Sequence, residues 1–210
     1  NLNNLFRDLG SDEFLSTAFE DYRCFYVFND GEYTIYNMKI WIVEEVFGGA
    51  NIEFGVKANN ELQRITIFGT PTSGTLTLSY ENSQIISNIN SNVDTWAINL
   101  QNQLNELPTL KDVRVLGQKL ENQIFFNIDF GGEDGLRSHD VIQHVSNSDG
   151  LQVTTTVVNS GNPINSLAEL IENENIPPTD VGFYKPLTSS PIVIPKLMPS
   201  EGFPIWAKRL

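Results

Sequence analysis

The stretch "LTLSYENSQIISNINSNVDTWAINLQNQLNEL", residues 76–107, changes from a strand pattern to a helix pattern inside a chain that otherwise reads as β-structure. Its first residues alternate apolar with polar side chains, which predicts a strand with one buried and one exposed face. Asn92 is a good helix N-cap, and Pro108 ends the helical pattern. The apolar residues between them recur at helical spacing: Val93, Trp96, Ala97, Leu100, Leu104 and Leu107. A helix with one apolar stripe must cover one face of a sheet.

The helix therefore predicts a separate α+β domain within a chain that is otherwise β-structure. Strand patterns occur on both sides of it, at residues 75–80, 85–91, 111–118, 122–130 and 151–159. In four of these segments the residues expected in the core share one parity, as a half-buried strand requires. They are Leu76, Leu78 and Tyr80; Val113 and Val115; Ile124, Phe126 and Ile128; and Val153, Thr155 and Val157. We expect residues 69–161 to form an inserted α+β domain, an antiparallel sheet with one helix on one face.

The remaining residues, 1–68 and 162–210, predict a discontinuous, antiparallel β-sandwich-like outer domain, so that the fold is mainly β. Strands are expected at residues 22–29, 34–46, 51–57 and 64–69. Asp30-Gly31 predicts a turn between the first two strands. The apolar residues of the second strand do not keep one parity, which predicts a bulge near Asn37.

Prolines gather in the last part of the chain, at positions 163, 177, 178, 186, 191, 195, 199 and 204. Residues 163–178 predict a short helix or an irregular crossing segment. Residues 191–210 predict edge strands and turns in a Pro-rich arm, because proline does not fit a central strand. The chain does not begin with methionine and its last residues are still strand-like, so we expect a piece of a longer product.

The composition limits the partners. A formal net charge of −13 without a basic patch disfavours nucleic acid and anionic membranes. The single cysteine, Cys24, excludes an intrachain disulfide, and its apolar strand context predicts a buried thiol. No apolar run is long enough for a membrane span, and no signal peptide opens the chain, so synthesis in the cytoplasm is expected.

Two groups of residues were considered as metal ligands. His139 and His144 are five positions apart, which is awkward for a shared zinc ion on a strand or a helix. The acidic loop from Asp129 to Asp140 offers carboxylates for calcium, but its spacing fits no EF-hand. Its candidate ligands are Asp129, Glu133, Asp134 and Asp140. The kinase-like tripeptide at Asp129 stands without the other kinase motifs, so we interpret it as chance.

Catalytic patterns are weak as well. Carboxylate pairs occur at Asp12-Glu13, Glu20-Asp21, Glu44-Glu45 and Glu172/Glu174. A glycosidase would need two of them across a cleft with aromatic platforms, for which Trp41, Trp96 and Trp206 are the tryptophan candidates. No phosphate loop, dinucleotide fingerprint or nucleophile elbow is present. We therefore predict a non-enzymatic protein with no catalytic, cofactor-binding or metal-binding residue.

Three segments carry a family resemblance. "YRCFYVFNDGEYTIYNMKIWI", residues 22–42, resembles the opening of structural proteins in the virions of tailed bacteriophages, and "FPIWAKRL", residues 203–210, resembles the strand that closes the same domain. Residues 73–117, together with "LQVTTTVVNSG" at 151–161, resemble a small domain of phage and bacterial surface proteins. Trp96, where a small residue is usual, and the acidic loop at residues 130–140 depart from that pattern.

The resemblance implies a structural virion component of the tail, neck or baseplate, which assembles with copies of itself and with other virion proteins. The expected localisation is the virion. Two alternatives stay open: a capsid decoration or cement protein, and a carbohydrate-binding adhesin that holds a host-surface glycan on exposed Tyr33, Tyr36 or Tyr80.

Overall fold

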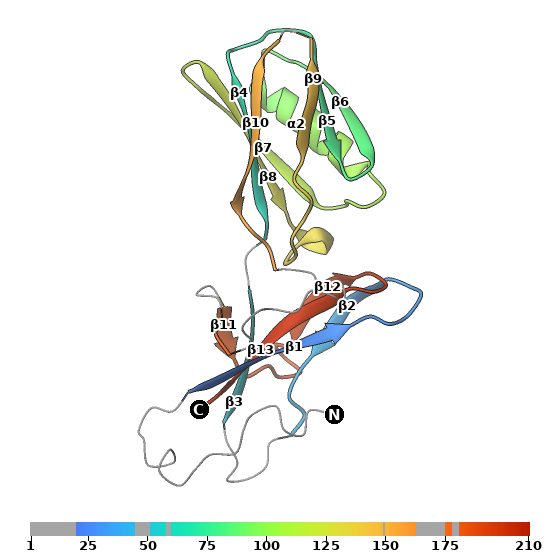
Figure 1. The fold of residues 1–210 in the computed structure, drawn as a ribbon, viewed down its shortest axis with the longest axis vertical. Helices are drawn as coiled ribbons and strands as arrows, with labels where there is room; N and C mark the ends of the chain where they lie inside the picture. The colour runs from blue at the N-terminus through green and yellow to red at the C-terminus, as the bar shows by residue number, and fades with distance from the viewer. Residues whose placement is uncertain (1–19, 45–50, 58–59, 149, 163–174, 178–180) are drawn as a thin grey trace. The chain divides into compact units, whose positions relative to one another are not determined.

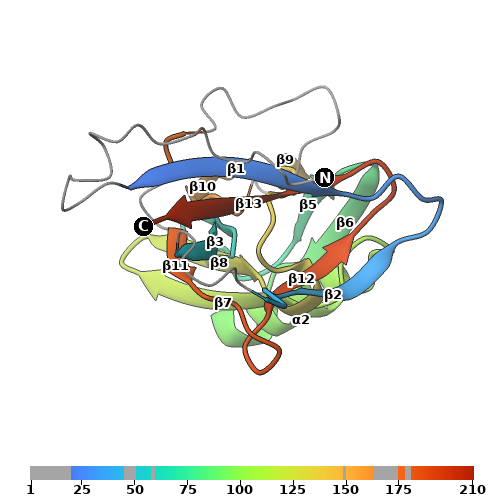
Figure 2. The same cartoon turned by 90° about the horizontal axis from the view of Figure 1, so that it is seen from below.

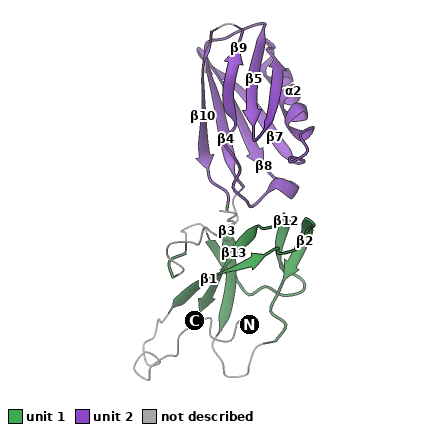
Figure 3. Cartoon of the chain, turned by 45° about the vertical axis from the view of Figure 1, so that its right-hand side comes forward, with its two compact units in different colours: residues 1–58, 162–210 green, residues 59–161 purple. Residues whose placement is uncertain are grey.

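A computed structural model describes residues 20–44, 51–57, 60–148, 150–162, 175–177 and 181–210. The expected mainly β class is confirmed: the described chain consists of antiparallel sheets with one α-helix (Figure 1). It divides into two compact units, shown in Figure 3. Unit 1 combines residues 1–58 with 162–210, and unit 2 is residues 59–161. The crossing segment expected at residues 163–178 falls almost wholly outside the described residues.

Unit 2 contains two antiparallel sheets and the helix. One sheet has the strand order β10-β4-β8-β7 and the other the order β6-β5-β9. The strands are β4 (Leu62–Phe68), β5 (Thr75–Tyr80), β6 (Ser83–Asn88), β7 (Val113–Leu120), β8 (Gln123–Phe130), β9 (Gln143–Asn147) and β10 (Gln152–Asn159). A short 3-10 helix, η1 (Gly132–Asp134), follows β8. The sequence predicted one sheet, but β5 and β6 form a second sheet, to which the unexpected strand β9 adds a third member.

The boundary between the units differs from the prediction. We expected residues 64–69 to belong to the outer domain, but β4 pairs with β8 and with β10 in unit 2. Its burial alternates strictly, with Ile65 and Ile67 fully buried. Unit 2 therefore begins at residue 59 instead of residue 69. The strand was misassigned because a half-buried strand looks the same whichever sheet it joins.

Helix α2 (Val93–Asn105) forms where the sequence predicts it. The side chain of Asn92 accepts a hydrogen bond from the backbone N–H of Thr95, which caps the N-terminus. The predicted stripe faces the core, and Trp96 lies fully buried with its ring 4.9 Å from that of Phe126. Its indole N–H donates to Ser87 Oγ at 2.9 Å. The departure at Trp96 is thus a core residue with its polar atom satisfied.

Unit 1 contains a four-stranded sheet of order β1-β13-β3-β11 and a two-stranded sheet of β12 and β2. The strands are β1 (Asp21–Phe28), β2 (Ile35–Ile40), β3 (Ile52–Lys57), β11 (Val181–Tyr184), β12 (Ile192–Leu197) and β13 (Gly202–Arg209). Strands β1 and β13 pair along their whole length although they lie at opposite ends of the described chain (Figure 2). Trp206 and Ile205 of β13 are buried in this unit.

The expectation that residues 191–210 form only edge strands is wrong for β13, which lies between β1 and β3. Pro204 is nevertheless tolerated, because the pairing with β3 covers only residues 206–209. At Pro204 the strand has one neighbour, opposite Tyr26 of β1, so the missing N–H disrupts no second ladder. Strand β12, which contains Pro195, has β2 as its one neighbour among the described strands, as expected for an edge strand.

The bulge expected near Asn37 is wrong: the structure has a left-handed residue there and no inserted residue. The register between β2 and β12 is the same on both sides of this residue, with Met38 opposite Ile194 and Tyr36 opposite Lys196. Asn37 itself adopts a left-handed backbone conformation with φ of 51°. Asparagine tolerates this conformation better than most residues, which explains the broken parity without an inserted residue.

Candidate functional site

Apolar side chains are exposed along β2 and the residues on either side of it. The exposed fractions are 82% for Tyr33, 37% for Ile35, 53% for Tyr36, 40% for Trp41 and 87% for Val43. We call these five residues the β2 strip. Lys39 is the one charged residue between positions 33 and 43, in a chain with a net charge of −13. The β2 strip is therefore an apolar segment in an acidic protein.

The backbone of β2 adds to this surface. Within the described residues, β2 pairs with β12 alone, so its other edge has no strand partner there. An edge strand with exposed apolar side chains is a template for pairing with another chain. The β2 strip thus offers both backbone hydrogen-bonding groups and apolar contact area to a partner.

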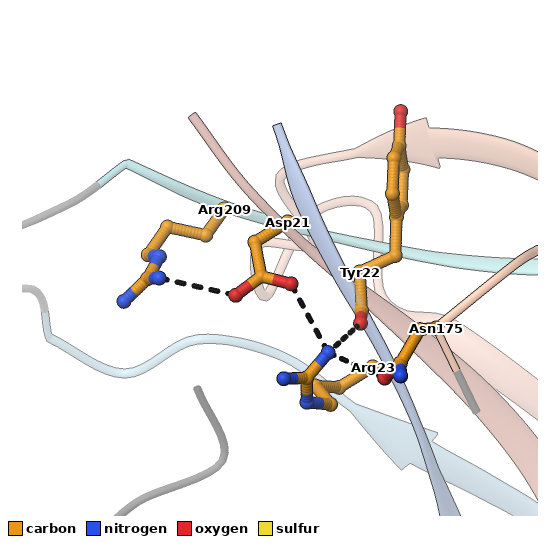
Figure 4. A network of polar contacts seen from close by, with 5 residues as sticks. All are labelled: Asp21, Tyr22, Arg23, Asn175 and Arg209. Carbon is orange, nitrogen blue, oxygen red and sulfur yellow. Dashed lines mark hydrogen bonds and ion pairs between the residues drawn. The ribbon is translucent and has the colours of Figure 1, made fainter. Parts of the chain in front are cut away.

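Of the carboxylate pair Glu20-Asp21, Asp21 lies in a network of polar contacts at one end of the β1–β13 ladder, drawn in Figure 4. Asp21 contacts Arg23 at 3.0 Å and Arg209 at 3.1 Å. Arg23 also donates to the backbone oxygen of Tyr22 and to the side chain of Asn175. Both oxygens of Asp21 are thus engaged by cations, which indicates a clamp on the strand pair and not a catalytic acid.

The neighbouring Glu20 is engaged in the same way. Its carboxylate contacts Lys208 at 2.7 Å and accepts a hydrogen bond from the Tyr22 hydroxyl. These two hydrogen bonds, first that of Lys208, lower the pKa of Glu20, while the pKa of Lys208 is raised by the same contact. Of the other carboxylate pairs, Glu44 is exposed, and Asp12-Glu13, Glu45, Glu172 and Glu174 lie outside the described residues.

The metal candidates do not converge. Asp129 lies in β8, while Glu133 and Asp134 lie in η1. Asp134 is fully buried and accepts hydrogen bonds from the backbone N–H groups of Lys111 and Asp112. In the part of the chain that the structure describes, no three His, Cys, Asp or Glu side chains gather closely enough to hold a metal ion. The acidic loop is therefore anchored by its own side chains.

The two histidines are separated and have different neighbours. His144 lies in β9 and contacts the Asn147 side chain. The ring of His139 stacks on Phe130, with 4.1 Å between ring centroids. His139 Nε2 lies 2.8 Å from the Asp134 carbonyl, which can only accept, so Nε2 carries the proton and Nδ1 accepts from the Tyr80 hydroxyl at 3.0 Å.

Tyr80 has the ionisation behaviour that this hydrogen bond needs. Burial raises its pKa well above the usual value, and the charges of Glu81 and Asp140 raise it further. Tyr80 is 3% exposed, so it presents no surface to a glycan, and the adhesin hypothesis is wrong for this residue. Tyr33 and Tyr36 are exposed, as that hypothesis requires, but they lie in unit 1.

The remaining sequence candidates are also located. Trp96 and Trp206 are core residues with 0% and 3% exposure, which leaves Trp41 as the one exposed tryptophan of the chain. Cys24 is buried, as predicted. No helix in the described ranges is long and apolar enough to cross a membrane.

Sequence reasoning missed two buried polar residues, Glu61 and Gln63. Gln63 donates to Glu61 at 2.7 Å and to the backbone oxygen of Asp140 at 2.9 Å, and it accepts from the N–H of Ile142. Both residues share the parity of the buried Ile65. Polar residues at core-facing positions of a strand are the signal that could have found them.

Comparisons of the chain with protein-family models, with curated proteins and with solved structures found no match. The function must therefore be argued from the surfaces and contacts of the molecule.

Proposed function

We propose that this chain is a non-catalytic structural subunit of a tailed-phage virion, which assembles with copies of itself through the β2 strip. A tail, neck or baseplate position is preferred to capsid decoration. The observation that carries the assembly role is the β2 strip itself: five exposed apolar residues beside a strand edge without a strand partner in the described chain.

The charge distribution favours a copy of the same chain as the partner. At a net charge of −13 two copies repel each other over most of their surface, and the segment from residue 33 to residue 43 lacks acidic residues. Contact through this segment brings apolar groups together with little added repulsion. Edge strands of identical subunits also pair by symmetry, which allows closed assemblies.

The pairing within unit 1 supports the virion class. Two of the segments that resemble phage virion proteins, residues 22–42 and 203–210, meet in the ladder between β1 and β13. Six consecutive residue pairs join them, from Tyr22 opposite Lys208 to Val27 opposite Phe203, so the beginning and the end of the resemblance lie in one sheet. This is the arrangement expected if both segments belong to one host domain.

The test is the mass of the full chain in solution, measured by light scattering over a range of protein and salt concentrations, with negative-stain images of the same sample. We expect an assembly of many copies. Its dissociation constant should fall as the salt concentration rises, because salt screens the repulsion between acidic subunits. A ring or tube indicates a tail, neck or baseplate component, whereas a closed shell indicates capsid decoration.

The double variant Tyr36→Ser/Trp41→Ser tests the surface. It removes two exposed aromatic side chains, so we expect a monomer that keeps the fold. Leu116→Ser is the matched control, because Leu116 is equally apolar, 65% exposed and in unit 2. The assignment to the β2 strip would be contradicted if the double variant still formed the assembly, or if Leu116→Ser were the variant that became monomeric.

A further inference from the structure

An open hollow of about 470 Å³ lies at one end of the four-stranded sheet of unit 2. Its lining consists of Phe68, Leu120, Glu121, Asn122, Gln123 and Gln152, with Gly69 beside them. The volume falls within the range of about 300–1,000 Å³ that is typical of small-molecule sites. No residue of the β2 strip takes part, so this is a separate surface.

The strand register explains why these side chains gather. Gln152 is opposite Phe68, Phe68 is opposite Gln123, and Gln123 is opposite Leu120. Directly opposed residues project to the same face of a sheet, so the four form one row across β10, β4, β8 and β7. Since Ile67 and Ile124, their neighbours along the strands, are buried, this row projects to the outer face.

The rim of the hollow is held in place by a backbone contact. The N–H of Gly69 donates to the carbonyl oxygen of Asn122 at 2.8 Å, which ties the end of β4 to the tip of the β7–β8 hairpin. Gly69 has φ of 109° and Glu121 has φ of 49°, so both turns use left-handed backbone. A tip fixed in this way loses little conformational freedom when a ligand binds.

The lining chemistry selects one kind of ligand. Asn122, Gln123 and Gln152 each both donate and accept hydrogen bonds. Among the described residues that line the hollow there is no lysine or arginine, which disfavours an anion. Glu121 is the one carboxylate in this lining, which is too few for a calcium ion with its six to eight oxygen ligands. Phe68 and Leu120, 37% and 56% exposed, add apolar surface between the amides.

We propose that this hollow binds a neutral saccharide. A sugar ring carries hydroxyl groups around its edge, which match the amide side chains, and C–H groups on its faces, which match Phe68 and Leu120. The site adds a ligand-binding role to unit 2 and does not depend on the assembly proposed for unit 1.

Saturation-transfer NMR on the full chain tests the proposal, because it observes the sugar and works whether or not the protein assembles. The probes are four neutral disaccharides: maltose, cellobiose, lactose and diacetylchitobiose. We expect at least one of them to receive saturation from the protein, most strongly at the C–H protons of one ring face. No transfer to any of the four overturns the proposal.

Variants locate the binding. Phe68→Ala and Gln152→Ala change exposed side chains of the hollow, and each weakens binding about tenfold or more, the factor that corresponds to one lost interaction of about 1.4 kcal/mol. Asn82→Ala is the control: it occupies the same Glu-Asn turn sequence in the β5–β6 hairpin, does not line the hollow, and leaves binding unchanged. Equal binding by both hollow variants, or loss of binding in Tyr36→Ala, overturns the proposal.

Discussion

The two units bury their apolar residues in different ways. Unit 2 has one continuous core to which β4, β5, β6, α2, β7 and β8 all contribute. Its largest side chains include Trp96, Phe126 and Phe130. In unit 1 the described buried apolar residues come from β1, β12 and β13 alone, and the β2 strip is exposed. Unit 2 also exposes apolar side chains, such as Ile98 and Leu116, but its continuous core favours stability of the unit by itself. The exposed apolar residues in unit 1, beside the edge of β2 that has no strand partner in the described chain, are instead suited to contact with another molecule. We therefore expect unit 2 to fold by itself, and unit 1 carries the surface through which we propose that the chain assembles.

The largest effect is expected from the core of unit 2. Trp96→Ala removes a fully buried ring and its hydrogen bond to Ser87, so it should lower the free energy of unfolding of a fragment of residues 59–161 by about 3–5 kcal/mol. Urea unfolding followed by circular dichroism measures this. Leu116→Ala in the same fragment is the counterpart: its side chain is exposed, and we expect stability to change by less than about 0.5 kcal/mol.

A smaller effect is expected where α2 crosses β7. A Cβ atom on Gly117 would lie 2.6 Å from Val93 Cγ1 and 2.8 Å from the Val93 carbonyl oxygen. Gly117→Ala should therefore destabilise the same fragment by about 1–3 kcal/mol through overpacking. Gly182→Ala in β11 is the control and is measured in the full chain, because residue 182 lies outside the fragment and a Cβ there meets nothing within 4 Å. Equal melting temperatures for Gly117→Ala and the unaltered fragment would show that helix and sheet are less closely packed than described.

In unit 1 the clamp on β1 and β13 should matter less than a core residue. Asp21→Asn removes the charge that pairs with Arg23 and Arg209 while keeping the size of the side chain. We expect a loss of about 1–2 kcal/mol in thermal or urea unfolding of the full chain, because the pairs are partly exposed. Glu32→Gln, at an exposed position before β2, should change stability by less than about 0.5 kcal/mol. A clamp that contributes nothing would make these two variants indistinguishable.

The smallest effect is expected at Tyr80, the one tyrosine of residues 59–161. Because burial raises its pKa, the folded fragment keeps this proton at pH values where the unfolded chain, with a tyrosine pKa of about 10, has lost it. Its contribution is fully present below about pH 10 and is lost as the pH rises further. Tyr80→Phe should cost about 1 kcal/mol at pH 8 through the lost bond to His139. It should also reduce the fall in stability between pH 8 and pH 11, whereas an unchanged fall would show that Tyr80 ionises normally.

The sequence predicted the parts of the fold that depend on local patterns. The cap at Asn92, the stripe from Val93 to Leu107 and the alternation in β5 all follow from periodicity, and the structure confirms them. The burial of Cys24 belongs to the same class. These features depend on neighbours within a few residues along the chain. The hairpin turn expected at Asp30-Gly31 is wrong: the chain only bends at residues 31–33, Gly31 does not have a positive φ, and β1 and β2 pair with β13 and β12 and not with each other.

The features that the sequence did not predict depend on distant partners. Strand β4 was assigned to the wrong unit because its pattern does not specify that β8 and β10 are its neighbours. Strand β13 was expected at an edge because Pro204 was considered without the position at which β3 begins to pair. The hollow at Phe68 arises from the register of four strands, so no local signal could have revealed it.

The central claim is that unit 1 assembles and unit 2 does not. The most direct test is the mass of the full chain and of residues 59–161, measured side by side by light scattering at equal molar concentration. We expect a many-copy assembly for the full chain and a folded monomer for the fragment. A monomeric full chain, or a fragment that assembles by itself, would contradict it.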